Sequence, residues 1–415
     1  MLPKPGAMKR WAHVFAVAMF INTSYGTLSY AFSVLISSDA AGGAFGARTI
    51  SLGFGAALLV SGIASLGAGT LADLFGSRRL MAGGSVLGAV ALCLLAASRE
   101  PWQAVLVLAF VAGPAMAATF YEPVYVLMNR WFAPFELPKA YGVLTFLSGF
   151  SITIYTPLTR WLVDAAGWRE GVVVLAAILL TVGLIVPAII SEPPRAKQGR
   201  QSLRRLVSET HKGLRQGDRA FWTFTLLFFV ATVAFSGFSF HMIAQLETRG
   251  FDKTGVANAI AITGIVSLPA RLLLPAFSGR VSSSILLTVC FALLAVAAVI
   301  ASVANDWWHV WLYIAVFGAV FGAIYPLRVL VTSERFSGEY FGRLIGAQAL
   351  FIAVGRALGP AAIGQFADDR HSYQLAFQAA AVVLNSLSHF FLRSKIEGRA
   401  AAISHRVSQR LCLAV

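Results

Sequence analysis

Charged side chains are scarce in this chain. They make up 12% of its 415 residues, while hydrophobic residues make up 58%. A soluble globular domain averages about 25% charged residues, so this shortage excludes a large soluble core and indicates a polytopic membrane protein. Cysteine is also rare. Cys93, Cys290 and Cys412 lie far apart, which predicts neither a disulfide framework nor a metal site.

Signatures of catalysis are missing as well. The sequence shows no glycine-rich phosphate loop, no paired carboxylates at the mouth of a site and no nucleophile motif. We therefore expect neither an enzyme nor a bound cofactor, and we expect any transport to draw on an ion or exchange gradient. The lack of a sizeable soluble domain or signalling tail argues against a third possibility, a non-transporting membrane sensor or scaffold.

Long apolar runs dominate what is present. A span needs about 20 residues, and a single chain with such runs crosses lipid as helices. The first run is too long for a signal-peptide core of about 7–15 residues, so we expect it to remain as a span. The sequence predicts an all-α membrane protein with twelve transmembrane helices, over residues 11–36, 49–72, 80–97, 102–129, 140–166, 170–190, 220–245, 254–277, 281–303, 307–332, 342–366 and 372–392.

The basic residues set the expected orientation. The net charge of +15 does not indicate nucleic-acid binding, because 23 of the 33 lysines and arginines fall on one side of the expected membrane and 7 on the other. Positively charged loops stay in the cytoplasm, so both termini are expected to be cytoplasmic. Short loops and a compact chain suggest a bacterial inner (plasma) membrane.

One connecting segment is unusually long, polar and basic, and it separates the runs into two sets of six. This segment is either an amphipathic helix on the anionic inner leaflet or a plain solvated linker. The expected domains are an N-terminal six-helix bundle (1–190), a cytoplasmic linker (191–218), a C-terminal six-helix bundle (219–392) and a cytoplasmic tail (393–415). Tyr141–Leu144 and Phe341–Leu344 are similar segments, which favours two related halves.

Two arginines lie inside apolar runs, where positive charge is costly. Arg271 is in the eighth run and Arg356 in the eleventh, and a charge at the bilayer centre costs roughly 2.5–3.5 kcal/mol even on lenient scales. An anionic transport substrate would compensate both positive charges, because guanidinium binds carboxylate through two parallel hydrogen bonds. The alternative is structural, with each arginine bonded to a carbonyl freed by a nearby proline or reaching towards the interface.

The first half carries no basic residue at corresponding depth. Aromatic and polar groups are therefore expected opposite the arginines, and the candidate substrate contacts are Asn22, Tyr25, Tyr30, Phe120 and Tyr121. Single aromatic residues more often serve in packing, and that alternative stays open.

The loop between the second and third runs has a compact pattern. Gly69 and Asp73 are one helical turn apart, Gly76 permits a tight turn, and Arg78 and Arg79 follow. The Asp73 carboxylate can accept hydrogen bonds from either arginine, or from exposed N–H groups at the start of another helix. The alternative is a generic basic turn.

This pattern resembles the signature loop of the major facilitator superfamily, and Ser191–Arg195 resembles its acidic-Pro-Arg motif. The resemblance implies two six-helix bundles that rock around a central site. Within the superfamily, Asn129–Phe132, Leu268–Arg271 and Arg356 resemble the branch of monocarboxylate transporters and oxalate–formate exchangers. Two departures from the proton-coupled carriers, Ser267 in place of an aspartate and a first span without their acidic motif, count against their proton mechanism.

Several ionisable residues are expected to act in gating. Glu122 and Arg328 lie in the fourth and tenth runs, which the resemblance places face to face, and we expect them to pair when the inner gate is shut. Independent partners for each are the alternative. Asp73, Arg130 and Glu192 are expected to form a charge network on the cytoplasmic face that locks the outward-open state.

The expected function is secondary active transport of a small organic anion, a mono- or dicarboxylate, by alternating access in symport or antiport. His241 is a possible proton-coupling residue, or else a hydrogen-bonded interfacial one. The expected partners are the anion, the lipid bilayer and a co-transported or exchanged ion, without nucleic acid, and the chain is expected to be a monomer. Efflux of an amphipathic drug-like or cationic compound is the main alternative, for which Glu122 is the clear intramembrane acid.

Overall fold

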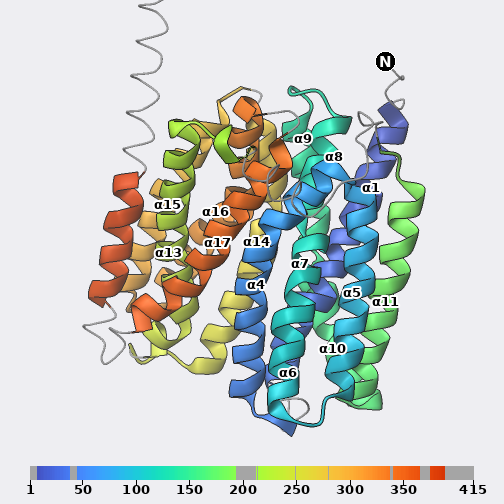
Figure 1. Cartoon of the computed structure of the whole chain (residues 1–415). Coiled ribbons are helices and arrows are strands. Elements are labelled where there is room, and N and C mark those ends of the chain that lie inside the picture. Colours follow the sequence, from blue (N-terminus) through green and yellow to red (C-terminus); the bar gives the residue numbers. More distant parts are fainter. Residues whose placement is uncertain are drawn as a thin grey trace, which may run out of the picture.

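The computed structural model describes residues 7–37, 44–192, 212, 214–247, 249–278, 280–336, 340–364 and 374–387. Within these residues the regular secondary structure is helical, and the helices form two groups that follow one another in sequence (Figure 1). Most of the predicted linker, including Arg195, and the whole predicted tail lie outside the described residues.

The N-terminal group begins with a nearly continuous helical segment, in which α1 (Ala7–Tyr25) passes through a π-helical turn, η1 (Gly26–Tyr30), into α2 (Ala31–Ser37). The turn begins at Gly26, whose missing side chain leaves room for the ring of Tyr155. The other elements of this group are α4 (Ala47–Leu74), α5 (Ser77–Ala97), α6 (Pro101–Val107), the π-helical turn η2 (Leu108–Ala112), α7 (Gly113–Thr119), α8 (Tyr121–Trp131), α9 (Leu137–Ser148), α10 (Ser151–Ala166) and α11 (Trp168–Ile189).

The C-terminal group consists of longer uninterrupted helices. Asp252 and Ser282 cap two of them, because each side chain accepts a backbone N–H from the first turn. The elements are α13 (Arg219–Glu247), α14 (Lys253–Phe277), α15 (Ser283–Val303), α16 (Trp307–Phe336), α17 (Phe341–Gly364) and a final helix, Gln374–Leu387.

Each of the twelve predicted runs lies on described helical structure. Among the described residues, nine helices are long and apolar enough to cross a membrane, and two further apolar helices are shorter. Large apolar side chains such as Phe110, Ile185 and Val296 are exposed to the surroundings, which suits contact with lipid. These features confirm the predicted multi-pass all-helical architecture, while the count of twelve spans remains a proposal.

The fourth run is not the single helix that its apolar length predicts. It divides into α6, η2, α7 and α8, and the break before α8 falls at Phe120, whose backbone is extended. Pro123 accounts for a break at this place, because proline is tolerated in the first turn of a helix but not in its interior. As a result, Tyr121 and Glu122 lie in the first turn of α8.

Two helix pairs, α4 with α17 and α9 with α14, join the halves of the molecule. Glycines make both contacts close. A Cβ atom on Gly142 would lie 2.8 Å from the carbonyl oxygen of Leu272, and one on Gly342 would lie 2.8 Å from the carbonyl oxygen of Gly69. Because Gly142 and Gly342 occupy the same place in the two similar segments, the interfaces are related copies, as expected for a repeated bundle.

Candidate transport site and gate

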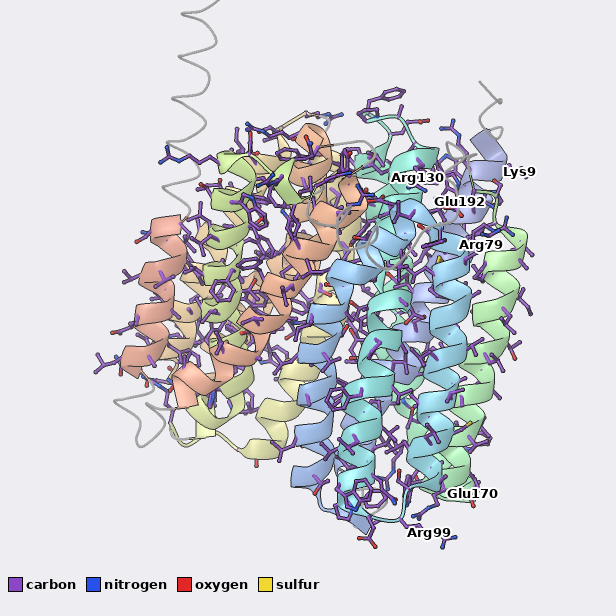
Figure 2. The ribbon with its side chains drawn as sticks, viewed as in Figure 1. Lys9, Arg79, Arg99, Arg130, Glu170 and Glu192 are labelled. Atoms are coloured by element: carbon purple, nitrogen blue, oxygen red, sulfur yellow. The ribbon has the colours of Figure 1, made fainter. Side chains whose placement is uncertain are left out.

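The charged ends of the helices define two ends of the molecule. Figure 2 shows Lys9, Arg130 and Glu192 at one end and Arg99 and Glu170 at the other. We call these the Asp73 end, where the signature loop lies, and the Glu170 end.

The N-terminal half contributes an aromatic wall. The ring of Tyr25 stacks on that of Phe120, with 3.9 Å between centroids, and lies 5.2 Å from the ring of Tyr121 and 6.3 Å from that of Tyr30. The Tyr121 and Ser148 hydroxyls are hydrogen-bonded at 2.6 Å, which fixes the Tyr121 side chain against α9. Four of the predicted contact residues, Tyr25, Tyr30, Phe120 and Tyr121, therefore come together.

Asn22 occupies a different environment from these rings. Asn22 is only 3% exposed, and its side-chain amide donates a hydrogen bond to the Leu147 carbonyl at 3.4 Å. The backbone carbonyl of Asn22 accepts a hydrogen bond from the Ser151 hydroxyl. In the described state Asn22 holds α1 against α9 and α10, and its contact with a passenger stays a prediction.

Arg271 enters from α14 between two glycines of neighbouring segments. A Cβ atom on Gly149, directly after α9, would lie 3.2 Å from Arg271 Cδ, and one on Gly322 of α16 would lie 2.6 Å from Arg271 Cγ. Arg271 Nε donates to Ser267 Oγ at 3.3 Å, so the side chain runs back along α14, away from the Asp73 end. Arg271 is partly exposed and close enough to Tyr121 to interact with it electrostatically.

Arg356 enters from α17 and is exposed, although it lies inside an apolar helix. Its guanidinium carbon lies 5.6 Å from the centroid of the Tyr325 ring, a cation–π contact within the C-terminal half. It also interacts electrostatically with Tyr25 and Tyr30 of the other half. The two arginines therefore come within electrostatic range of the same aromatic wall from different helices, Arg271 of Tyr121 and Arg356 of Tyr25 and Tyr30.

Glu122 and Arg328 do not form the expected pair in this state. They are close enough to interact electrostatically, but no ion pair joins them among the described residues. Glu122 lies in the first turn of α8, where the exposed N–H groups and the helix dipole favour a negative charge without a cationic partner. Arg328 is 2% exposed, and its guanidinium lies 5.9 Å from the centroid of the Phe228 ring.

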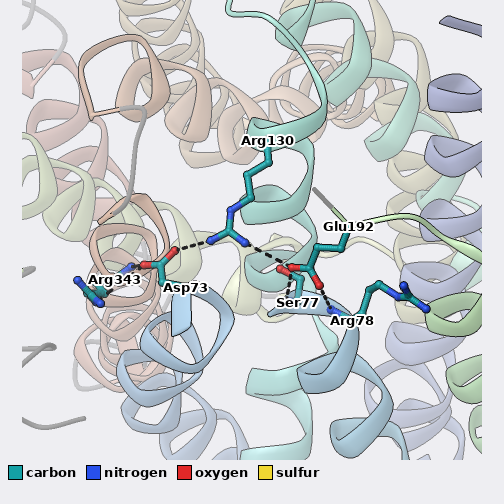
Figure 3. A network of polar contacts seen from close by, with 6 residues as sticks. All are labelled: Asp73, Ser77, Arg78, Arg130, Glu192 and Arg343. Atoms are coloured by element: carbon teal, nitrogen blue, oxygen red, sulfur yellow. Dashed lines mark hydrogen bonds and ion pairs between the residues drawn. The ribbon is translucent and has the colours of Figure 1, made fainter. Parts of the chain in front are cut away.

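A charge network closes the Asp73 end (Figure 3). Arg130 bridges two carboxylates, with Nη2 3.4 Å from Asp73 and Nη1 3.3 Å from Glu192. Glu192 accepts the backbone N–H groups of Ser77, at 3.1 Å, and Arg78, at 3.5 Å, at the start of α5. The network thus ties the ends of α4, α8 and α11 to one another, as the charge pattern predicts.

Asp73 carries this network across to the other half. Its carboxylate accepts the backbone N–H of Arg343 at 3.2 Å, at the start of α17. This is the second of the two contacts considered for Asp73, with a helix N-terminus as the donor. The Arg78 side chain instead donates to the carbonyls of Pro187 and Ala188, and Arg79 is exposed. Gly76 has a φ of 103°, which favours glycine in the turn.

Arg343 is a functional candidate that the sequence pattern did not single out. It counted only as one more basic residue on one side of the membrane, yet its side chain is fully buried, with Nε 3.9 Å from the Asp73 carboxylate. The similarity of Tyr141–Leu144 and Phe341–Leu344 could have pointed to it, because the first copy has an uncharged valine at the matching place.

His241, the predicted proton-coupling residue, lies half-buried on α13.

Comparison with known proteins agrees with this architecture. Residues 14–360 match the Major Facilitator Superfamily. The chain belongs to this superfamily, which confirms the family resemblance and indicates a transporter rather than an enzyme. The branch of carboxylate carriers within the superfamily remains a proposal.

Two solved structures share the fold. The human organic anion transporter MFSD10 (TETRAN) aligns with a TM-score of 0.76 at 15% sequence identity, over 93% of this chain and 100% of that one. The E. coli fucose:proton symporter FucP aligns with a TM-score of 0.70 at 14% identity, over 92% of this chain and 98% of that one. At such low identity these likenesses establish the fold alone.

Proposed function

We propose that this protein is a secondary active transporter that moves a small organic anion, a mono- or dicarboxylate, by alternating access. The observation that carries the proposal is the placement of Arg271 and Arg356, two arginines within apolar helices that both keep accessible surface and both interact electrostatically with tyrosines of the aromatic wall. Fixed positive charge at such depth is most readily stabilised by a negative guest. The aromatic rings would contact the apolar body of the anion.

We propose further that the Asp73 end is cytoplasmic, in agreement with the excess of basic residues on that side. The described state would then be closed to the cytoplasm, and the passenger would enter from the Glu170 end. Rocking of the halves would separate Asp73 from the start of α17, so the residues Gly69, Asp73, Gly76, Arg130, Glu192 and their neighbours Arg78 and Arg79 would act as the inner gate.

The energy source in this proposal is an ion or exchange gradient. His241 is the proton-coupling candidate in this proposal, because histidine is the side chain suited to proton exchange near neutral pH. Uptake that stays constant between about pH 5.5 and 7.5 would exclude that role.

Uptake by the protein reconstituted in liposomes tests the proposal. Arg271→Gln and Arg356→Gln should each abolish uptake of labelled carboxylates while leaving the protein folded. Arg160→Gln is the matched control, because Arg160 pairs with Asp164 on the exposed surface of α10. Near-normal uptake by both of the first two variants would contradict the proposed binding role.

The aromatic wall favours a second candidate, efflux of an amphipathic drug-like compound. The stacked rings of Tyr25 and Phe120 would suit a planar apolar guest as well as the body of an acid. Competition with unlabelled carboxylates and with lipophilic dyes distinguishes the two functions. If the protein carries organic anions, carboxylates should inhibit uptake of the labelled acid and dyes should not. That an organic anion transporter has the same fold shows only that the fold can accommodate such a passenger.

A further inference from the structure

Arg328 is a buried cation with two nitrogen atoms that lack hydrogen-bond partners among the described residues. Its side chain is 2% exposed, and neither Nε nor Nη1 has a hydrogen-bond partner among the described residues. A buried guanidinium without hydrogen bonds destabilises the folded protein, since it loses its water without a replacement. The contact with the Phe228 ring compensates this loss only in part.

A second unused polar group lies on the same face of α16. The hydroxyl of Tyr325 is buried and also has no hydrogen-bond partner among the described residues. Tyr325 and Arg328 are three residues apart in the helix, so their side chains are neighbours. Together they offer donors to a single acceptor group, which is what a carboxylate provides.

Tyr325 also connects Arg328 with the candidate transport site. The guanidinium of Arg356 lies over the aromatic ring of Tyr325, 5.6 Å from its centroid. Arg356 is exposed and Tyr325 is partly exposed, whereas Arg328 is buried. A ligand held by Arg356 would therefore reach Arg328 by passing along Tyr325.

The charged residues of this region carry an excess of two positive charges. Three positive charges interact with this region, Arg271 with Tyr121 and both Arg328 and Arg356 with Tyr25. Glu122 brings one negative charge. The other charged side chains of α1, α4, α5 and α9 lie near the ends of those helices. An excess of two positive charges between the halves would be balanced by a dianion and only half balanced by a monoanion.

We propose that Arg328 and Tyr325 form a second carboxylate subsite, so that the passenger is a dicarboxylate held at one end by Arg356 and at the other by Arg328. This inference rests on the proposed anion transport and narrows its substrate class. It also gives Arg328 a role that differs from gating through a pair with Glu122.

The test compares mono- and dicarboxylates of equal length in reconstituted protein. Unlabelled straight-chain acids of two to six carbons would compete with the best labelled acid of the series. The wild type should bind the dicarboxylate at least about tenfold better than the matching monocarboxylate, as one additional charge-assisted hydrogen-bond contact implies. Arg328→Gln should lose this preference and still transport the monocarboxylate. Arg335→Gln, which alters an exposed arginine of the same helix, should keep it.

A second variant covers the case in which Arg328→Gln fails to fold. Tyr325→Phe removes one hydroxyl and should weaken dicarboxylate binding by about 2- to 10-fold without affecting the monocarboxylate. A wild type that prefers monocarboxylates would overturn the inference but leave the proposed function intact. A folded Arg328→Gln protein would also overturn the inference if it kept the preference for the dicarboxylate, or if it transported neither acid. Failure of the wild type to take up any acid would defeat the proposed function itself, and the inference with it.

Discussion

Replacing Asp73 by asparagine should open the Asp73 end of the protein. The carboxylate accepts the backbone N–H of Arg343 at 3.2 Å and pairs with Arg130 at 3.4 Å, so it joins the two halves only while this end is closed. A hydrogen bond to a charged group contributes about 1.5–3 kcal/mol. The Arg130 side chain is 24% exposed, which makes its ion pair a smaller contribution. Loss of one charge-assisted bond would shift the equilibrium towards the open state by about 10- to 150-fold.

Labelling of a cysteine at position 65 measures this shift. Ser65 is 2% exposed, and its hydroxyl donates to the Gly346 carbonyl of α17 at 2.9 Å, so the closed interface covers it. In a background without the native cysteines, Ser65→Cys should react slowly with a maleimide. Asp73→Asn should raise the rate by about 10- to 150-fold, in proportion to the open population.

Asp164→Asn provides the control for this experiment, because it removes a carboxylate from an exposed surface pair and should leave the labelling rate unchanged. The reasoning is refuted if Asp73→Asn protein elutes and melts like the parent and yet labels at the same rate. In that case the contact between Asp73 and the start of α17 would not hold the halves together.

Two further predictions concern the helix interface and the aromatic wall. Gly342→Ala would place a methyl group 2.8 Å from both the Gly69 carbonyl and the Asp73 carboxylate, so it should lower the thermal stability and speed labelling at position 65, with a cost of about 1–3 kcal/mol. Gly83→Ala, at a site with open space, should leave the melting temperature unchanged or raise it slightly. Tyr121→Phe loses the 2.6 Å bond to Ser148 and should raise the KM for the passenger by about fivefold with little change in kcat; an unchanged KM would mean that Tyr121 only packs.

The sequence predicts much of the architecture because membrane crossing imposes a simple rule. Lipid requires long apolar helices, and all twelve predicted runs lie on described helices. The signature loop gives two alternatives for Asp73, the nearby arginines or the start of another helix, and the structure shows the second. The similarity of the segments at Gly142 and Gly342 favours two related halves, and the structure adds that both glycines lie where the halves meet closely.

Side-chain partners are harder to predict than helices. The apolar length of the fourth run hides the break at Phe120, although Pro123 is a signal for it. Arg328 and Glu122 lie on runs that are expected to face each other, but whether they touch depends on how each helix is rotated about its axis, which packing decides and hydropathy does not. The charge of Arg343 does not set it apart from other basic residues, because charge alone does not reveal burial at an interface; its only distinguishing signal is the valine at the matching place of the first half.

A structure determined by electron cryomicroscopy with the preferred acid bound would test the central claim most directly. We predict density for the acid between the aromatic wall and the C-terminal half, with a carboxylate within hydrogen-bonding distance of Arg271 or Arg356. Both guanidinium groups turned towards lipid or fully bonded to protein, with the acid bound elsewhere, would contradict the account.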